Sequence, residues 1–426
     1  MESSQVLRFA GDVTVSKVRI ITAKGFYQDV SAQVLNIQVY EDLFSPFMSG
    51  SLILKDSLDL VNLFPFIGEE YLELELSTPS IEKYSIKGKY YIYKMSNREM
   101  TGDKSVVYQL HFISLEAIVD LNKKVSRVFA GDISKLIEPF IKNKTYGLES
   151  DKNVSIEDTS NNLKYISNYW TPIQNIMYLV FSAVNKNKSP NYVFFENRDG
   201  FYFISLESLY SNPVVYQNFV YDKYTRDDLP GGGSARNIEK DYNRIIEISM
   251  PTVFDYMDRI RSGMLSSRQI SYDITKKTYS DKNYTMFQRF EQQKHLNKFP
   301  INSDSSTFRA NSKIINLPKN FGNFNGFGDV TQSKSNQERT SLMKLAEANK
   351  INITVLGRCD YTVGQKINLD LKRIEPLSSI DGDTTDKMFS GNYIIAAINH
   401  YVDRQVYECH MEIIKESSMM NMNRNK

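Results

Sequence analysis

Cysteine is scarce in this sequence, which argues against a chain held together by disulfides. Only Cys359 and Cys409 occur among 426 residues. Both fall in predicted strands, and we interpret them as small buried residues of a chain made in a reducing cytosol. A single cross-strand disulfide is the alternative.

Long hydrophobic runs are absent as well. The longest apolar stretch, 176–184, is far shorter than the about 20 residues that a membrane-spanning helix needs. The first residues, MESSQVLRFAGDV, lack the basic segment and apolar run of a signal peptide. The sequence therefore predicts no membrane insertion and no secretory route.

A strong charge of either sign is missing too. Lysine and arginine total 52, and aspartate and glutamate total 50, which leaves a net charge of +2. This balance gives no general electrostatic footprint for nucleic acid or for an anionic membrane. Aromatic residues are abundant instead, and 27 Tyr with 24 Phe favour strands over helices. At about 100–200 residues per domain, the length predicts two to four domains.

Histidine is also rare, and its spacing does not indicate a metal site. The four histidines are His111, His295, His400 and His410. No two of them have a metal-ligand spacing such as H-x-x-x-H. His400 and His410 lie on the two arms of one predicted hairpin and could meet across it. We interpret His410, which falls on the polar face of its strand, as an exposed or interface histidine rather than a ligand.

Short catalytic and binding motifs are incomplete. Ser341 and Lys344 match S-x-x-K, but the S-D-N and K-T-G partners are missing, so a solvated helix face is favoured. The acidic run 381–386 lacks the glycine and the final glutamate of a calcium loop. The glycines 231–233 lack the Lys-Ser/Thr of a P-loop and are interpreted as a linker. Because no nucleophile, base and orienting group assemble, we expect no enzyme activity, no cofactor and no metal.

Successive strands with one apolar face are predicted for 18–114. The clearest is the run in which Leu72, Leu74 and Leu76 alternate with Glu73 and Glu75. Alternation of this kind is typical of a half-buried strand, so we expect the leucines to face a core. Strands separated by turns at this spacing predict a small antiparallel barrel or sandwich.

The middle of the chain changes character. A helix is predicted for 132–142, a polar loop for 148–162, and a second helix for 173–184. Thr171 and Pro172 supply an N-cap followed by proline at the first helical position. A hairpin is predicted for 193–206, turning at 198–200. Two helices followed by a hairpin indicate a small α+β module.

A second β-module is predicted near the end of the chain. Residues 340–349 predict a short helix, 351–355 and 367–371 predict strands, and 393–414 predicts a long hairpin. A helical turn, a glycine and a strand are predicted for 256–277, and a long polar stretch covers 282–338.

The predicted fold class is α+β, mainly β, with two small antiparallel β-barrels and an outer α+β domain. We expect the first barrel in 1–116 and the outer domain in 117–235. The second barrel takes 236–280 plus 339–416, the segment 281–338 is a long polar loop or insertion of the outer region, and 417–426 is a flexible tail.

The order of these parts resembles the baseplate hub proteins of contractile-tailed phages, and the N-terminal hub part of VgrG-type spike proteins. Three sets of residues carry the resemblance: 37–57 with the strands that follow it, DYMDRIRSGMLSSRQISYDITKKTY at 255–279, and LGRCDYTVGQKINLDL at 356–371 with the hairpin 391–414. VgrG chains continue into a spike, whereas this sequence stops at Lys426. That difference favours a separate hub over a fused spike.

The resemblance implies a structural virion protein of the tail baseplate, assembled in the host cytoplasm. A homotrimer would present six barrel modules as a ring that adapts the six-fold tail tube to the three-fold central spike. Implied partners are the tail-tube proteins, the central spike protein and the surrounding baseplate wedge proteins, with DNA passing through during ejection. The alternatives are a VgrG-like hub of a secretion or tailocin particle, and a β-rich carbohydrate-binding module.

A channel that passes DNA should not bind it, because each phosphate contact would slow ejection. A neutral or acidic channel lining is therefore expected. Glu73 and Glu75 lie on the polar face of a predicted barrel strand. Because the family that the chain resembles forms its channel from barrel strands, we expect these two glutamates to face the lumen.

Overall fold

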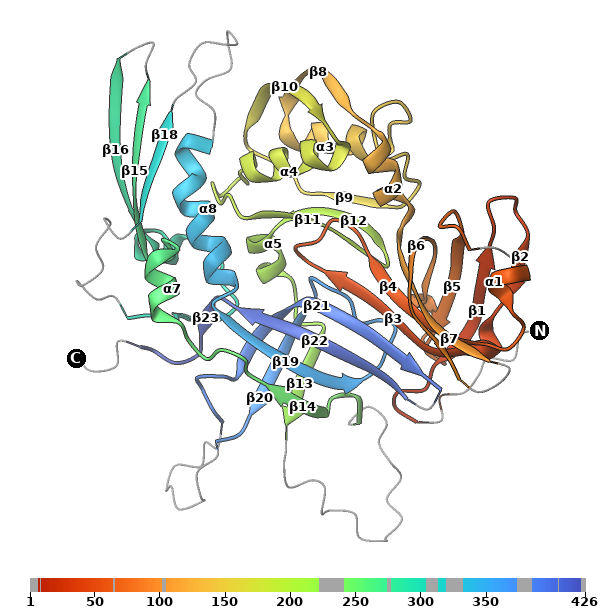
Figure 1. Ribbon diagram of the computed structural model, residues 1–426. Coiled ribbons are helices and arrows are strands. Elements are labelled where there is room, and N and C mark those ends of the chain that lie inside the picture. The colour runs from red at the N-terminus through yellow and green to blue at the C-terminus, as the bar shows by residue number, and fades with distance from the viewer. Residues whose placement is uncertain are drawn as a thin grey trace.

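The computed structural model describes residues 7, 9–63, 66–101, 105–221, 241–273, 277–303, 313–318, 332–373, 385–404 and 406–422. The fold is mainly β, as expected from the sequence (Figure 1). Thirteen strands form one large sheet that draws on both ends of the chain. Most of its neighbours are antiparallel, and the parallel pair of β13 with β20 is an exception.

The first part of the large sheet comes from the first 114 residues, and its strands confirm the predicted ones. They are β1 (Thr14–Ile21), β2 (Tyr27–Asp29), β3 (Val34–Asp42), β4 (Ser49–Asp56), β5 (Tyr71–Ser77), β6 (Ile86–Met100) and β7 (Val106–Ser114). Short helices lie between them: η1 (Ser31–Gln33), α1 (Leu60–Leu63) and η2 (Glu82–Tyr84). Leu72, Leu74 and Leu76 are all buried, so the predicted strand register is confirmed.

The second part of the sheet comes from later in the chain. Its strands are β13 (Tyr216–Tyr221), β14 (Ile245–Ser249), β19 (Asn349–Leu356), β20 (Lys366–Leu371), β21 (Gly391–Asp403) and β22 (Tyr407–Lys415). β21 pairs with β3, which joins the two parts, so the strand order is β14-β19-β22-β21-β3-β4-β7-β6-β5-β1-β2. Pairings among the described strands leave this path open rather than closing it into a barrel. β13 falls in the range expected for the outer domain, yet it pairs with β20 of the sheet.

A separate α+β layer covers one face of the sheet (Figure 1). It contains α2 (Leu115–Asn122), β8 (Val125–Asp132), α3 (Ile133–Lys142), β9 (Val154–Ile156), β10 (Asn162–Trp170), α4 (Pro172–Ser182), β11 (Tyr192–Asn197), β12 (Gly200–Ser205) and α5 (Leu206–Ser211). The predicted helices and hairpin are confirmed, and Thr171 forms a capping box with Gln174. The expected loop 148–162 is wrong in part, because β9 pairs with β12.

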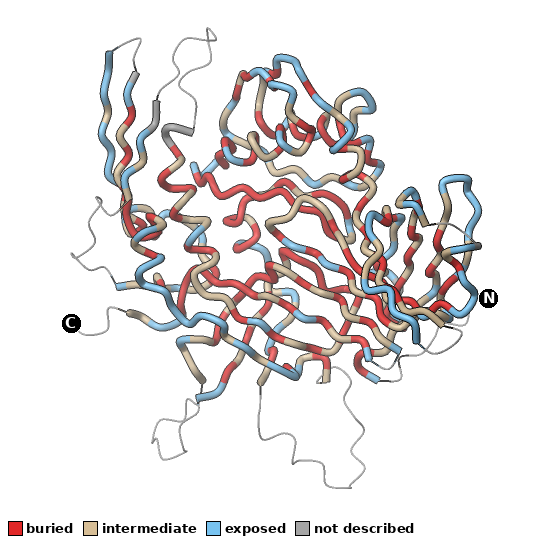
Figure 2. Tube along the Cα trace, in the orientation of Figure 1, coloured by how far each residue is buried: buried red, intermediate tan, exposed pale blue. Residues whose placement is uncertain are grey.

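β11 is buried along its whole length because it lies between two cores. Val193 and Phe195 pack into the core of the large sheet, whereas Phe194 packs into the core of the outer layer. Figure 2 shows this continuous run of buried residues between the sheet and the layer above it. A strand buried on both faces reads as an uninterrupted apolar run, as VFF at 193–195 does.

The stretch expected to be a long polar loop contains regular structure. β15 (Ser266–Asp273) pairs with β16 (Thr278–Thr285) and with β18 (Ile314–Pro318), so a three-stranded arm projects from the molecule (Figure 1). α7 (Tyr256–Arg261) and β15 confirm the helical turn and the strand predicted for 256–277, whereas η4 (Met286–Gln288), η5 (Phe290–Gln292) and β17 (Phe299–Pro300) lie within the expected loop. The expectation of a loop is therefore wrong where these elements and β18 lie.

Helix α8 (Gln332–Ala346) begins eight residues before the predicted helix at Thr340. It lies between the arm and the outer layer (Figure 1). Its first half buries polar side chains that bond to both neighbours. Gln337 donates to the Ser267 carbonyl at 3.0 Å, and Arg339 donates to the Pro190 carbonyl at 2.6 Å.

Two further expectations are corrected near the C-terminus. The tail expected to be flexible from 417 begins with β23 (Ser417–Ser418), which is buried and pairs with β17. Cys359 lies in a turn after β19 rather than in a strand, although it is buried as expected. Residues 231–233 and 381–384, which the phosphate-loop and calcium-loop interpretations concern, lie outside the described residues.

Candidate functional site: the polar face of the large sheet

Catalytic and metal chemistry find little support in the described part of the chain. No group of three or more histidine, cysteine, aspartate or glutamate side chains there could hold a metal ion. Ser341 is fully buried and donates its hydroxyl to the Met264 carbonyl at 2.5 Å. Its expected place on a solvated helix face is therefore wrong, and this contact leaves the hydroxyl engaged as a structural donor.

The two cysteines lie in a buried polar cluster with His400 and Tyr407. His400 Nδ1 lies 2.8 Å from the Tyr407 hydroxyl and 3.4 Å from Cys409 Sγ. Tyr407 also contacts Cys359 Sγ at 3.6 Å, and both thiols are free. Burial lowers the pKa of His400 to about 3 and raises that of the Cys409 thiol. A neutral imidazole and protonated thiols make this cluster packing rather than a reactive site.

His410 does not meet His400 across the hairpin. Cys409 is the residue opposite His400, and His410 lies opposite Asn399 on the other face of the sheet. The His410 ring is exposed and stacks on Tyr401, with ring centroids 5.5 Å apart. The expectation of an exposed histidine is confirmed.

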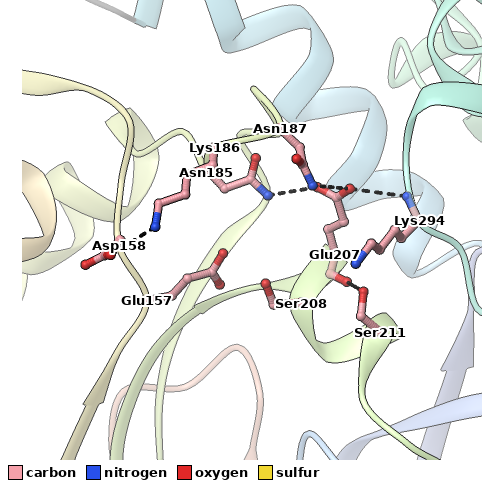
Figure 3. Close-up of a pocket in the computed structure, with 9 residues that line it drawn as sticks. All are labelled: Glu157, Asp158, Asn185, Lys186, Asn187, Glu207, Ser208, Ser211 and Lys294. Carbon is pink, nitrogen blue, oxygen red and sulfur yellow. Dashed lines mark hydrogen bonds and ion pairs between the residues drawn. The ribbon is translucent and has the colours of Figure 1, made fainter.

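A polar pocket of about 340 Å³ lies where the outer layer meets the 290–297 segment (Figure 3). Glu207 is its buried centre. The Glu207 carboxylate accepts from Asn185 at 2.8 Å, from Asn187 at 3.2 Å and from the Lys294 backbone at 3.2 Å. The pocket is lined by Glu157, Asp158, Asn185, Lys186, Asn187, Glu207, Ser208, Ser211 and Lys294. This lining offers no aromatic platform for a sugar ring, and Glu207 serves to join three chain segments.

Charged groups hold the outer layer together and join it to the large sheet. Within the layer, Lys152 bridges Glu116 of α2 at 2.7 Å and Glu196 of β11 at 2.5 Å. Burial alone would lower the pKa of Lys152, but the two carboxylates outweigh it and raise that pKa. Toward the sheet, Glu196 accepts from the Met48 backbone N–H at 3.0 Å, and Glu41 of β3 accepts from the Arg198 and Val363 backbone N–H groups, both at 3.1 Å. These last contacts could not be predicted from the sequence, because the partners are far apart in it.

The most extensive functional candidate is the face of the large sheet that the outer layer leaves uncovered. Every strand from β14 to β1 contributes residues to it, because their non-buried residues pair with one another along the path, with β-bulges at some of the pairings. We call it the polar face. It joins the two expected β-modules into one surface, which follows from pairing of β3 with β21.

Glu73 and Glu75 both lie on the polar face, in the middle of a set of cations. Glu73 stands between Arg19 of β1 and Lys89 of β6. In the next row Glu75 stands between Lys17 and Lys87. Lys17 lies 3.8 Å from Glu73, with both side chains about one-third exposed, and Arg19 lies 3.6 Å from Asp29 of β2. The sequence placed the glutamates correctly but missed the cations, because register between strands cannot be read from alternation alone.

The opposite end of the polar face is acidic. Asp42, Glu247, Glu408 and Glu412 lie there, with one cation, Lys350, bonded to Glu412 at 3.1 Å. A groove of about 500 Å³ crosses five strands at this end. Between the two ends the face carries few charges: Lys55 of β4 and Glu99 of β6 lie opposite Val107, and Lys94 of β6 lies opposite His111. Gln38 and Asn399, also in this middle part, share a hydrogen bond of 3.2 Å.

The polar face thus changes from an acidic end, through a middle part with few charges, to a mixed end where four cations flank Glu73 and Glu75. Because neither sign of charge dominates the whole face, such a surface can contact water or a polyanion.

In the described part of the chain, no helix is both long and apolar enough to cross a membrane.

No family model matches the sequence, and no curated protein matches it. Solved structures do match over nearly its whole length. A tail protein from Neisseria meningitidis MC58 matches with a TM-score of 0.52 and 11% identity, covering 94% of this chain and 96% of that one. The 43 kDa tail protein of prophage MuSo2 from Shewanella oneidensis matches with a TM-score of 0.54 and 8% identity, covering 94% and 98%.

An E. coli component of the type VI secretion system aligns with a lower TM-score of 0.43 and 8% identity, covering 96% of this chain and 78% of that one. At identities this low, the two stronger matches concern the fold. The chain therefore has the fold of phage tail proteins, the class that its sequence resembles.

Proposed function

We propose that this chain is the central hub protein of a phage-type tail baseplate, acting as a structural protein rather than an enzyme. The observation that carries the proposal is the length of the match: the tail proteins from Neisseria and Shewanella are covered over 96% and 98% of their chains. A likeness over whole chains supports a shared architectural role better than a likeness over one module. The protein would then reside in the virion tail, after assembly in the host cytoplasm.

Two barrel-like modules within the large sheet support the proposal. In the second module β14, β19, β22, β21, β20 and β13 are neighbours in that order. Val220 of β13 forms a bridge to Arg244, next to β14, so the two ends of this path approach each other. In the first module the Val30 backbone N–H donates to the Val18 carbonyl of β1 at 2.9 Å. Val30 lies four residues before β3 begins, so the chain that leads into β3 lies beside β1.

A homotrimer would place six such modules around one axis, which suits a ring between a six-fold tube and a three-fold spike. Contacts between unlike surfaces of identical subunits close into rings when the rotation allows it. The tail-tube proteins would bind one side, the central spike protein the other, and the baseplate wedge proteins the outside. The modules correspond to residues 1–116 and to 236–280 plus 339–416, with 117–235 as the outer domain and β13 completing the second module.

The polar face would line the channel of this ring. Glu73 and Glu75 would then face the lumen, as expected from the sequence, and would neutralise the cations on either side of them. Without the glutamates, four cations would stand side by side where DNA passes, and phosphate contacts with Lys and Arg dominate non-specific affinity for DNA. The acidic end of the face would repel the phosphates directly.

The mass of the purified protein tests the proposal. Light scattering should report three times the 49.2 kDa of one chain for the protein alone, or a mass that includes three copies of the chain when its tube and spike partners are bound. A monomer under every condition, including with both partners, would contradict the hub. A VgrG-like hub of a secretion or tailocin particle would share this mass. The two functions are distinguished by the kind of particle in which the protein is found.

A further inference from the structure

A small cavity lies where four parts of the chain converge. It has a volume of about 10 Å³ and lies between the outer layer, the 290–297 segment, α8 and the end of β22. Its lining includes Ser189, Asn191, Glu207, His295 and Glu416. The first three and Glu416 are nearly fully buried. This volume matches about one water-sized probe.

Three polar atoms of this lining have no hydrogen-bond partner in the described part of the chain. They are Ser189 Oγ, Asn191 Oδ1 and Glu416 Oε2. Ser189 is 1% exposed, and Asn191 and Glu416 are each 3% exposed. A buried polar group without a partner costs about 1–3 kcal/mol, and more when it is charged. Three residues that line one cavity therefore each have a polar atom that a ligand in the cavity could satisfy.

The surrounding contacts are otherwise complete, so loose local geometry does not explain these atoms. Glu416 Oε1 accepts from the Leu296 backbone at 2.8 Å and from Ser417 Oγ at 3.0 Å. The Ser189 backbone N–H donates to Asn185 Oδ1 at 2.8 Å. Both oxygens of Glu207 are engaged elsewhere, which leaves the three open atoms as the ones that a ligand would satisfy.

The number of open atoms favours a water molecule over a metal ion. The cavity offers three oxygen atoms, whereas a calcium ion takes about 6–8 oxygen ligands. The other oxygen of Glu416 is already engaged: His295 Nδ1 lies 3.2 Å from Glu416 Oε1, and His295 Nε2 lies 2.7 Å from the Phe290 carbonyl.

We propose that this cavity is a binding site for one water molecule. The water donates its two protons to Asn191 Oδ1 and Glu416 Oε2 and accepts the Ser189 hydroxyl proton. Three hydrogen bonds are the usual number for a buried water, and these donors and acceptors match them one for one. The water would tie the C-terminal strand to the outer layer across a junction that lacks a direct Asn191–Glu416 bond.

A crystal structure at a resolution that shows ordered water tests the site directly. The expected result is a density peak about 2.7–2.8 Å from each of the three oxygen atoms, the commonest O–H···O distance. Distances of about 2.3–2.6 Å, typical of a bound calcium ion, would overturn the proposal. So would a dry cavity in which the three atoms find partners within the protein.

A double-mutant cycle provides an independent readout in solution. Asn191→Ala and Glu416→Gln should each lower Tm, and the double variant should lose less than the sum, because both changes act on one bridging water. Additive losses would contradict the bridge. Ser211→Ala, which removes a donor to the Glu207 carbonyl, serves as the control and should be additive with Glu416→Gln. Replacing sodium chloride with choline chloride should leave Tm unchanged; a sodium-specific rise would indicate an ion instead.

Discussion

His400 illustrates how a single buried side chain can couple this fold to pH. It is fully buried beside Tyr407 and Cys409, and burial, reinforced by the charge of Arg198, lowers its pKa to about 3. In the unfolded chain the imidazole has the ordinary value of 6.5. The folded state therefore keeps His400 neutral at pH values where the unfolded state binds a proton.

The sign of the effect follows from that difference. Stability contributed by neutral His400 is fully present above about pH 6.5 and is lost as the pH falls toward about 3. The loss should reach about 5 kcal/mol. We predict that urea unfolding of His400→Asn shows a flatter decline between these pH values than the wild type, despite lower stability at pH 7.

His410→Gln is the matched control, because His410 lies on the exposed face of the same hairpin. It should keep the acid dependence of the wild type. Equal acid dependence in His400→Asn and the wild type would show that another group governs the transition.

Burial of individual residues was predictable where alternation was strict and unpredictable where polar groups pair over long sequence distances. Cys359 and Cys409 are buried as expected. Glu41 and Lys152 also lie in the interior, although nothing near them in the sequence indicates it. Their partners, such as Glu196 for Lys152, are supplied by other elements. A buried charge is tolerated only with such partners, and these become visible only in the folded chain.

At the scale of elements, β5 gives the sharpest test of register. Leu74 is 2% exposed and packs into the core of the large sheet, whereas Glu73 lies on the polar face. We predict that Leu74→Ala lowers the free energy of unfolding by about 2–5 kcal/mol. Leu74→Asp should cost more, because it buries an unpaired charge.

Glu73→Gln should change stability little, because a half-exposed ion pair such as Lys17–Glu73 contributes about 0–1 kcal/mol. Thermal melts of the three variants are the measurement. Leu74→Ala as mild as Glu73→Gln would place β5 one residue out of register.

Helix α8 shows why some elements could not be found from sequence. Its first half reads QSKSNQERT, with no apolar stripe at helical spacing. Periodicity therefore indicated a helix only from Thr340, where leucines begin. The missing half is stabilised by polar contacts: Gln337 bonds to the arm and Arg339 to the outer layer. The same reasoning explains β16, whose polar pairs with β15, such as Asp281 with Arg268, carry no alternation of apolar residues.

The rows around Glu73 and Glu75 lead to a prediction about DNA. Glu73→Gln with Glu75→Gln leaves Lys17, Arg19, Lys87 and Lys89 without carboxylates between them. We predict that the double variant binds duplex DNA several-fold more tightly than the wild type at low salt. Added salt should abolish the gain, because the new contacts are with phosphates. Fluorescence anisotropy of a labelled duplex measures both.

Glu247→Gln with Glu408→Gln is the matched control, since it removes the same charge from the acidic end of the polar face, away from the four cations. This control variant should bind duplex DNA only weakly, without the gain expected for the first double variant. An equal gain in both double variants would mean that net charge alone decides, and no gain in the first would refute neutralisation by Glu73 and Glu75. Replacing Glu73 and Glu75 with lysine is less informative, because each row would then hold three positive charges on neighbouring strands. Like charges directly opposite each other lower the stability of a sheet, by about 0.2–1 kcal/mol per pair.

At the scale of the whole molecule, the order of modules was predictable from sequence, but their union was not. The strands of 18–114 and of 351–414 were expected in two barrels. Pairing of β3 with β21 places them in one sheet, with one core that includes both Leu74 and Ile398. A pairing between strands more than 350 residues apart leaves no local signal in the sequence, whereas the alternation within each strand does.

We propose that this protein forms the ring-shaped hub of a tail baseplate, and electron microscopy of the purified protein tests this most directly. We expect a ring with a central hole and three-fold symmetry. A map that resolves the strands should place Glu73 and Glu75 on the inner wall. Compact monomers without a hole, alone and in the presence of tube and spike proteins, would contradict the hub. A ring with either glutamate on its outer surface would contradict the assignment of the polar face to the channel.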